Sequence, residues 1–313
     1  MARTTSMPRN NLRIKVGTYA GDGNDSRSIS GVGFEPDFVL IKGGSQHSVW
    51  RTKKMIGDQT AYNSNASANL ADSIQQIMSD GFQVGTSITA NAVGTTYHYI
   101  AIKGLDGQKC FAVGQYFGNG ANDRDFSVGG VSFTPDIVMT KRNGASAGCF
   151  RTSTMVGDLS APFGTTAFTA DYVQSLITNG FQLGTDDVVN NNASYYNFLA
   201  LKSYPGVVAV GSYAGDGSDN REITGVGFQP DLVIIKASTN INRAVLRFST
   251  QTGDETASFA NVALAADLIQ SLIADGFQVG TANGVNAVAG TPVYHWIAIK
   301  AGDFNLPITR TTV

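Results

Sequence analysis

The chain repeats one sequence pattern three times, and this repeat limits its fold more than any other feature. Each copy opens with valine, glycine, a variable residue and tyrosine, and a glycine-rich turn follows. The opening glycines are Gly17, Gly114 and Gly211, and each lies 97 residues after the one before. A period of this length is too long for a solenoid unit and is typical of one small domain per copy. We therefore expect three tandem domains of similar structure.

Further landmarks recur in each copy and place the domain boundaries. They are a proline-aspartate pair, an arginine six residues before a Gly-Asp pair, a Gly-Phe-Gln motif and an apolar segment that ends in lysine. They divide the chain into an N-terminal arm (1–11), three β modules (12–105, 106–205 and 206–302) and a C-terminal tail (303–313).

Short apolar runs between turn signals predict strands rather than long helices. Residues 38–41 and 232–235 are rich in β-branched residues, as expected of strands buried on both faces. Residues 74–84 predict a hairpin with an Asp-Gly turn, and a short helix in its first half is the alternative.

The closing segments 97–102 and 294–299 are also apolar on both faces, so a second layer must pack there. A sister repeat is the simplest candidate for that layer. The fold class that we expect is all-β, with three tandem β-sandwich modules arranged as a pseudo-trimer.

The composition excludes several classes of partner. The chain has 22 basic and 24 acidic residues and a formal net charge of −2, which does not favour nucleic acid. No apolar stretch approaches the length of a membrane span, and the N-terminus lacks the apolar region of a secretory signal. The first fifteen residues carry only basic charges, which predicts either a solvated tail or an arm that docks on an acidic neighbour. These basic residues are Arg3, Arg9, Arg13 and Lys15.

Two cysteines, Cys110 and Cys149, occur in the second copy alone. A module that folds twice without a disulfide does not need one. We interpret them as buried thiols of a protein made in a reducing compartment, and a disulfide is the alternative.

Catalytic and metal-binding patterns are weak. The three histidines are His47, His98 and His295, and the second copy has Asn197 in place of the last two. A histidine in an apolar strand is more often a hydrogen-bonded core residue than a ligand. No cysteine-histidine spacing fits zinc, and no nucleophile elbow or Walker lysine occurs. We therefore expect neither an enzyme nor a cofactor.

The glycine-rich turn of the first and third copies alternates acidic residues and glycines. Such a loop could offer oxygen ligands to calcium, although Asx-Gly turns explain the same pattern without a metal. The second copy substitutes asparagines, and the glutamate of an EF-hand is absent, so we expect no metal. The carboxylates concerned are Asp22, Asp25, Asp216 and Asp219.

Two arginines and one aspartate recur in every copy and are the candidate site residues. One interpretation is a structural ion pair in each module, because arginine is the natural bidentate partner of a carboxylate. The other is three equal polar pockets for sugar hydroxyls, which would gain avidity on a repetitive surface. The residues are Arg27, Arg124, Arg221, Arg51, Arg151, Arg247, Asp58, Asp158 and Asp254.

The string GVGFQPDLVIIK at residues 225–236 resembles a repeat module of tailed-bacteriophage virion surface proteins, of the tail-fibre and head-decoration type. The Asp-Gly-Phe hairpin and the closing aromatic-Ile-Ala strand belong to the same pattern. The resemblance covers almost the whole chain, but the second copy departs at residues 129–132, where it is two residues longer. The order of strands is also similar to that of H-type lectin sandwiches.

The resemblance implies a non-enzymatic virion structural protein on the particle surface, as a capsid decoration or cement protein or attached to the tail. Its partners would be other virion proteins, and its location the virion, assembled in the host cytoplasm. The alternative is a receptor-binding adhesin of the tail-fibre type that recognises host surface glycans. A glycan-cleaving enzyme lacks support, because no recurring pair of acids stands in a suggestive setting.

Overall fold

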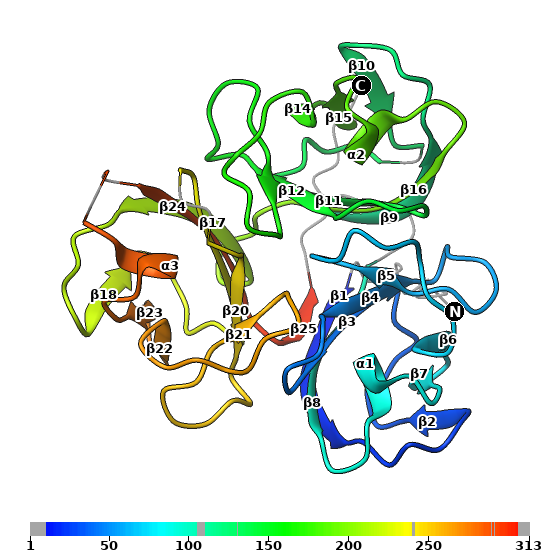
Figure 1. Cartoon of the computed structure of the whole chain (residues 1–313), viewed down its shortest axis with the longest axis horizontal. Coiled ribbons are helices and arrows are strands. Elements are labelled where there is room, and N and C mark those ends of the chain that lie inside the picture. The colour runs from blue at the N-terminus through cyan, green and yellow to red at the C-terminus, as the bar shows by residue number, and fades with distance from the viewer. Residues whose placement is uncertain are drawn as a thin grey trace, which may run out of the picture.

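A computed structural model describes residues 11–104, 110–129, 131–239, 242–288, 290 and 292–305. The described residues form antiparallel sheets and three one-turn helices, so the all-β expectation is confirmed. Almost all of the predicted N-terminal arm, with Arg3 and Arg9, lies outside the described residues. The three repeats form three lobes around a common centre (Figure 1).

The first module combines a large and a small sheet. The elements of the large sheet, in spatial order, are β1 (Asn11–Ala20), β8 (Thr96–Lys103), β3 (Phe38–Gly43), β4 (Val49–Thr52) and β5 (Ala61–Tyr62). Those of the small sheet are β2 (Arg27–Ile29), β7 (Gly81–Val84) and β6 (Ile74–Met78). The helix α1 (Ile88–Asn91) follows β7.

The second module repeats this plan. Its large sheet contains β9 (Phe111–Phe117), β16 (Tyr195–Leu201), β11 (Ile137–Arg142), β12 (Cys149–Thr152) and β13 (Ala161–Pro162). Its small sheet contains β10 (Arg124–Ser127), β15 (Gly180–Leu183) and β14 (Val173–Ile177), and its helix is α2 (Asp187–Asn190).

The third module has the same order of strands. Its large sheet contains β17 (Val208–Ala214), β24 (Val293–Ile299), β19 (Leu232–Ala237), β20 (Val245–Phe248) and β21 (Ala257–Ser258). Its small sheet contains β18 (Arg221–Thr224), β23 (Gly276–Val279) and β22 (Ile269–Ile273), and its helix is α3 (Asn283–Asn286).

The last described strand, β25 (Gly302–Asn305), returns to the first module and pairs with β1. Arg13 of β1 forms an ion pair with Asp303 of β25 at 3.2 Å. The predicted tail therefore begins inside a strand, and its residues 306–313 lie outside the described residues. This pairing joins the two ends of the three-module chain.

The two-sided burial of the central strands divides the core of the described residues into four clusters. Val39 and Ile41 of β3 pack between the two sheets of their own module. Phe38 and Leu40 point to the other face, where one cluster collects residues from all three modules. Since neighbouring residues of a strand point to opposite faces, one apolar run serves both cores. The expectation that sister repeats cover the second face is thus confirmed, and Figure 1 shows the large sheets turned toward the shared centre.

The central cluster is built from equivalent positions of the three modules. Each large sheet contributes two residues from its central strand (β3, β11 or β19) and two from the neighbouring closing strand (β8, β16 or β24). They are Phe38, Leu40, Ile100 and Ile102 in the first module, Ile137, Met139, Leu199 and Leu201 in the second, and Leu232, Ile234, Ile297 and Ile299 in the third.

The predicted Asp-Gly hairpin at residues 74–84 is correct, and the alternative of a helix is wrong. Strands β6 and β7 pair in antiparallel fashion, with a bulge between Ile74 and Gln76. The one-turn helix α1 comes later, after β7, where Ser87 caps it by accepting a hydrogen bond from the amide of Thr89.

The glycine that opens each copy has a packing reason. Gly17 lies opposite Tyr99 in the pairing of β1 with β8. A β-carbon at Gly17 would stand 2.5 Å from the Tyr99 hydroxyl, so the aromatic ring needs the space that glycine leaves. Phe198 lies over Gly114 and Trp296 over Gly211 in the same way.

Candidate functional site

The buried arginine of each module does not form the ion pair that its spacing suggested. Arg51 is 5% exposed, and its guanidinium donates to the carbonyls of Met55 (3.1 Å), Gly57 (2.6 Å) and Ile74 (3.3 Å). The carboxylate of Asp58 instead accepts from the backbone amide of Asp72 at 2.8 Å. The expected pair is wrong because a tight turn folds its carbonyls over the guanidinium and leaves the carboxylate outside. Burial lowers the pKa of Arg51, and the more distant Asp58 partly offsets this.

The other two modules use the same arrangement. Arg151 donates to the carbonyl of Gly157 at 2.7 Å, and Arg247 to that of Gly253 at 2.5 Å. Asp158 and Asp254 accept from backbone amides, as Asp58 does. The recurring spacing of six residues between the arginine and the glycine thus lets the guanidinium donate to the glycine carbonyl of its own turn. These glycines have positive φ, between 61° and 69°, which other residues adopt only with strain.

The second recurring arginine also serves its own module. Arg27 forms an ion pair with Asp22 at 3.2 Å, and Arg221 forms the equivalent pair with Asp216 at 3.2 Å. Arg124 faces an asparagine turn and donates to the carbonyl of Phe117 (2.7 Å) and to Asn190 Oδ1 (3.1 Å). The two sets of arginines therefore hold loops together within each module and do not converge on one pocket.

The glycine-rich loops that were weighed as calcium ligands use their carboxylates in turns and side-chain contacts. Asp22 Oδ1 accepts from the amide of Asn24 at 2.9 Å, and this hydrogen bond is the main cause of its lowered pKa. Asp25 accepts from Gln75 at 2.7 Å, and Asp219 accepts from Gln270 at 2.8 Å. Within the described part of the chain, no three His, Cys, Asp or Glu side chains come together as a metal site.

Both cysteines are free thiols, as the sequence predicted. Cys149 is buried and Cys110 half-buried, and burial raises the pKa of both, that of Cys110 to about 11. A thiol with a raised pKa is a poor nucleophile at neutral pH.

The two equivalent histidines lie at contacts between modules. His98 Nδ1 is 2.8 Å from the hydroxyl of Thr250 in the third module, and His295 Nδ1 is 2.8 Å from that of Thr154 in the second. Burial lowers the pKa of both, and that of His295 to about 4. They are hydrogen-bonded residues of the junctions, as was predicted for a histidine in an apolar strand.

A set of buried lysines, which the sequence analysis missed, crosses the same junctions. Lys42 Nζ donates to the carbonyl of Ala260 in the third module at 3.1 Å. Lys141 reaches Ser67 of the first module at 3.1 Å, and Lys236 reaches Gly164 of the second at 3.1 Å. Burial lowers the pKa values to about 7, 7 and 8 respectively. A lysine at the end of a buried apolar run in all three copies was the signal in the sequence.

Backbone hydrogen bonds follow the same cyclic order. The first module donates to the third, the third to the second, and the second to the first. The three bonds run from Ser48 to Phe259 (3.0 Å), from Ala244 to Phe163 (3.1 Å) and from Gly148 to Asn63 (2.7 Å).

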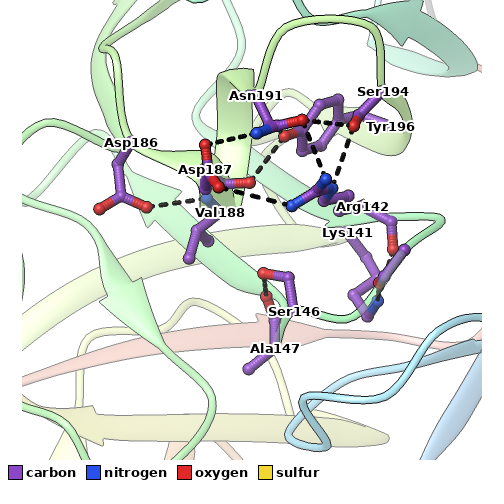
Figure 2. Close-up of polar contacts among 11 residues, drawn as sticks. Lys141, Arg142, Ser146, Ala147, Asp186, Asp187, Val188, Asn191, Ser194 and Tyr196 are labelled. Atoms are coloured by element: carbon purple, nitrogen blue, oxygen red, sulfur yellow. Dashed lines mark hydrogen bonds and ion pairs between the residues drawn. The ribbon is translucent and has the colours of Figure 1, made fainter.

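The second module carries an additional polar cluster around Arg142 at the end of β11 (Figure 2). Its guanidinium donates to Asn191 Oδ1 (2.9 Å) and Ser194 Oγ (3.2 Å) and lies 3.7 Å from a carboxylate oxygen of Asp187. Tyr196 donates to the carbonyl of Asp187 at 2.7 Å. These contacts secure the α2 turn, and the nitrogens of Arg142 are engaged within the cluster.

The remaining candidate is a groove between the first and third modules, which we name the 1–3 groove. Its volume is about 550 Å³, within the range of small-molecule sites. It is lined by Thr96, His98, Thr250, Gln251, Glu255 and Leu264, among others. His98 stacks on Phe248 at its inner side, with ring centroids 5.9 Å apart.

The equivalent spaces at the other two junctions are bridged. Phe168 of the second module donates its amide to the carbonyl of Ser238 (2.9 Å), and its ring lies 5.2 Å from that of His295. Asn69 of the first module bonds to the carbonyl of Asn143 at 2.8 Å. The matching residues at the 1–3 groove are Leu264 and Gly44, which lack such a bond although both are described.

Gln251 distinguishes the wall of the 1–3 groove from its counterparts. The other two copies have Met55 and Met155 at this position. Gln251 is 6% exposed, and its Oε1 accepts from the amide of Phe248 at 2.9 Å. Its Nε2 has no hydrogen-bond partner among the described residues. In an alignment of the three copies, this position is polar in the third copy and methionine in the other two, and this difference is the sequence signal for it.

The fold and these contacts define an all-β tandem-repeat protein whose recurring charged residues serve its own architecture. Among the described residues, no helix has the length and apolar character needed to cross a membrane. The chain belongs to the family described as "Domain of unknown function (DUF7483)", whose model matches residues 13–104 and 206–306, more than half of the chain. Comparisons with curated proteins and with solved structures gave no match.

Proposed function

We propose that this chain is a non-enzymatic structural protein on the surface of a bacteriophage virion, attached to the capsid or the tail. In this proposal the three modules act as a pseudo-trimer made from one chain. Its partners are other virion proteins, and it joins the particle in the host cytoplasm. The virion assignment comes from the resemblance of the repeat to phage surface modules.

The use of the recurring charged residues is the observation that carries the structural role. Arg51 and its two equivalents bind the carbonyls of their own turns, and Lys42 and its equivalents bind carbonyls of the next module. What the repeat preserves is therefore the architecture of the modules and of their junctions. A set of repeated catalytic or ligand sites would instead leave such groups directed at a pocket.

The pseudo-trimer is supported by the central cluster and by the cyclic order of the junction bonds. Each module supplies equivalent apolar residues to the centre and gives an equivalent backbone hydrogen bond to the next module of the ring. A closed ring of heterologous contacts is the arrangement that a cyclic homotrimer uses. Pairing of β25 with β1 adds a further link between the ends of the chain.

Binding to particles tests the proposal. The purified chain would be mixed with phage particles that lack it and, separately, with host cells, and the heat-unfolded chain would serve as the control. We expect saturable binding to the particles, together with density for three-lobed bodies at regular positions on the intact virion. A chain that never sediments with particles would refute the structural role.

A second candidate function is a receptor-binding adhesin for host surface glycans. The open 1–3 groove favours it, because a virion scaffold has no evident need for a polar groove at one junction of three. In this case the chain would bind host cells, and a competing free sugar would release it. Binding to particles alone would exclude this candidate.

A further inference from the structure

The 1–3 groove exists because residues that fill the equivalent space at the two other junctions are replaced here by smaller ones. Its position is occupied at the two other junctions, by Phe168 against His295 and by Asn69 against Asn143. At the open junction the matching position is Gly44, and Thr96 stands where the second module has Tyr195. Small residues at both positions leave the space open while the backbone bonds and the buried lysine stay in place.

The groove is lined mainly by neutral hydrogen-bonding groups. Five of its lining residues are threonines, and they come from both modules: Thr18, Thr95, Thr96, Thr250 and Thr252. Glu255 is exposed and adds a carboxylate that accepts hydrogen bonds. Such groups match the hydroxyls of a polyol, each of which can both donate and accept a hydrogen bond.

The charges at the groove argue against an anionic ligand. Lys42 lines the groove, but its ammonium donates to the carbonyls of Gln46 and Ala260 and is committed to the junction. Burial lowers the pKa of His98, which favours its uncharged form. The carboxylate of Glu255 would repel a phosphate, a sulfate or an acidic sugar.

The amide nitrogen of Gln251 supplies an independent observation that points to a ligand. A buried donor without a partner lowers the stability of the fold, and methionine at the same position avoids this loss in the two other modules. The polar exception therefore occurs at the open junction, beside the hydroxyl-lined wall. Gln251 is among the residues that line the groove, and its Nε2 has almost no exposed surface; a turn of the side chain toward the groove would bring Nε2 to a ligand oxygen.

We propose that the 1–3 groove binds a neutral, hydroxyl-rich ligand, a short carbohydrate unit, with Gln251 donating to one of its oxygens. This inference deepens the second candidate function and rests on it for its biological meaning. The binding itself is a property of the isolated chain, since both walls of the groove come from that chain.

Titration calorimetry on the full chain tests the inference directly. The probes are glucose, galactose, mannose, N-acetylglucosamine, maltose and lactose, with glucuronic acid and N-acetylneuraminic acid as charged counterparts. We expect at least one neutral sugar to bind at a single site per chain and the charged sugars to bind more weakly. Preference for a charged sugar, or no binding by any probe, would overturn the inference.

Two variants locate the binding site. Gln251→Met restores the residue of the other modules, and Gly44→Asn introduces the residue that the second module has in a matching position. Each should weaken binding of the neutral sugar at least tenfold while the chain stays folded. Val156→Thr changes the exposed position of the second module that matches Thr252 and should leave affinity unchanged. Unaltered binding by both groove variants would also overturn the inference.

Cell binding separates the failure of this inference from that of the adhesin function. A chain that binds host cells equally well with and without Gln251→Met is an adhesin that uses another site. A chain that binds free sugar in the groove but does not bind cells supports the inference and excludes the adhesin role.

Discussion

The three copies share their side-chain contacts inside the modules but differ in the side chains at the junctions between modules. Inside each module the arginine that binds its own turn, the aspartate that caps the next turn and the glycine under an aromatic ring occur three times with the same contacts. At the junctions the backbone bonds and buried lysines are shared, yet the side chains at the rim differ. The shared architecture is therefore preserved in the module interiors, whereas the copies have diverged where one module meets another.

The largest effect should follow from removing a buried interior arginine. Arg51→Ala leaves several carbonyls without a donor in a dry turn, so we expect a loss of about 3–5 kcal/mol in the free energy of unfolding. Urea denaturation would measure it. Arg27→Ala is the control, because its ion pair with Asp22 is partly exposed and should contribute much less to stability. Equal stability of Arg51→Ala and the unchanged chain would contradict the structural interpretation.

The next effect depends on pH and comes from the junction histidine. The pKa of His295 is about 4 in the folded chain against 6.5 when unfolded, so the unfolded state gains the proton first as pH falls. Stability is therefore lost between pH 6.5 and 4, by roughly 3 kcal/mol for this group. His295→Asn, which copies the second module, should remove that part of the loss.

Melting curves at pH 7 and pH 4 on both chains would measure the contribution of His295. His98→Asn should change the acid sensitivity in the same direction, because burial lowers the pKa of His98 too. If the acid-induced drop in Tm is identical with and without His295, the junction is not the acid-sensitive element.

A smaller effect should come from opening a closed junction. Phe168→Ala removes a partly buried ring that packs on His295, and we expect a loss of about 2 kcal/mol. Leu264→Ala at the open junction is the matched change and should cost less, since no equivalent ring contact exists there among the described residues. Chemical denaturation of both variants provides the measurement, and a larger loss from Leu264→Ala would reverse the comparison.

The smallest effect, and the one of opposite sign, concerns Gln251. Gln251→Met removes a buried donor without a partner and should raise stability by about 1 kcal/mol in the absence of ligand. Met155→Gln is the mirror change at a closed junction and should lower stability by a similar amount. Differential scanning calorimetry would detect both shifts in Tm. A destabilised Gln251→Met chain would mean that the amide already has an adequate partner.

The module plan was predictable because it is encoded locally. A continuous apolar run at residues 38–41 and an Asp-Gly turn at 80–81 each indicate a strand or hairpin with no reference to distant parts of the chain. The burial of both faces of β3 followed from composition alone, since apolar residues without polar alternation must be covered twice. The ion pair between Arg51 and Asp58 was mispredicted because spacing shows which residues are near but not which acceptor a turn presents.

The repeat by itself determined that this protein is built from three β modules with free thiols and two-sided apolar strands. Only the tertiary structure decided which strands pack against one another and which carbonyls accept from Lys42. It also decided that the junction between the first and third modules contains a groove. The physical reason is the separation of the contacting residues along the sequence. The preference for a turn or a strand is set by residues only a few positions apart. The 1–3 groove, in contrast, joins residues more than 200 positions apart, such as Gly44 and Leu264, which only the packed modules bring together.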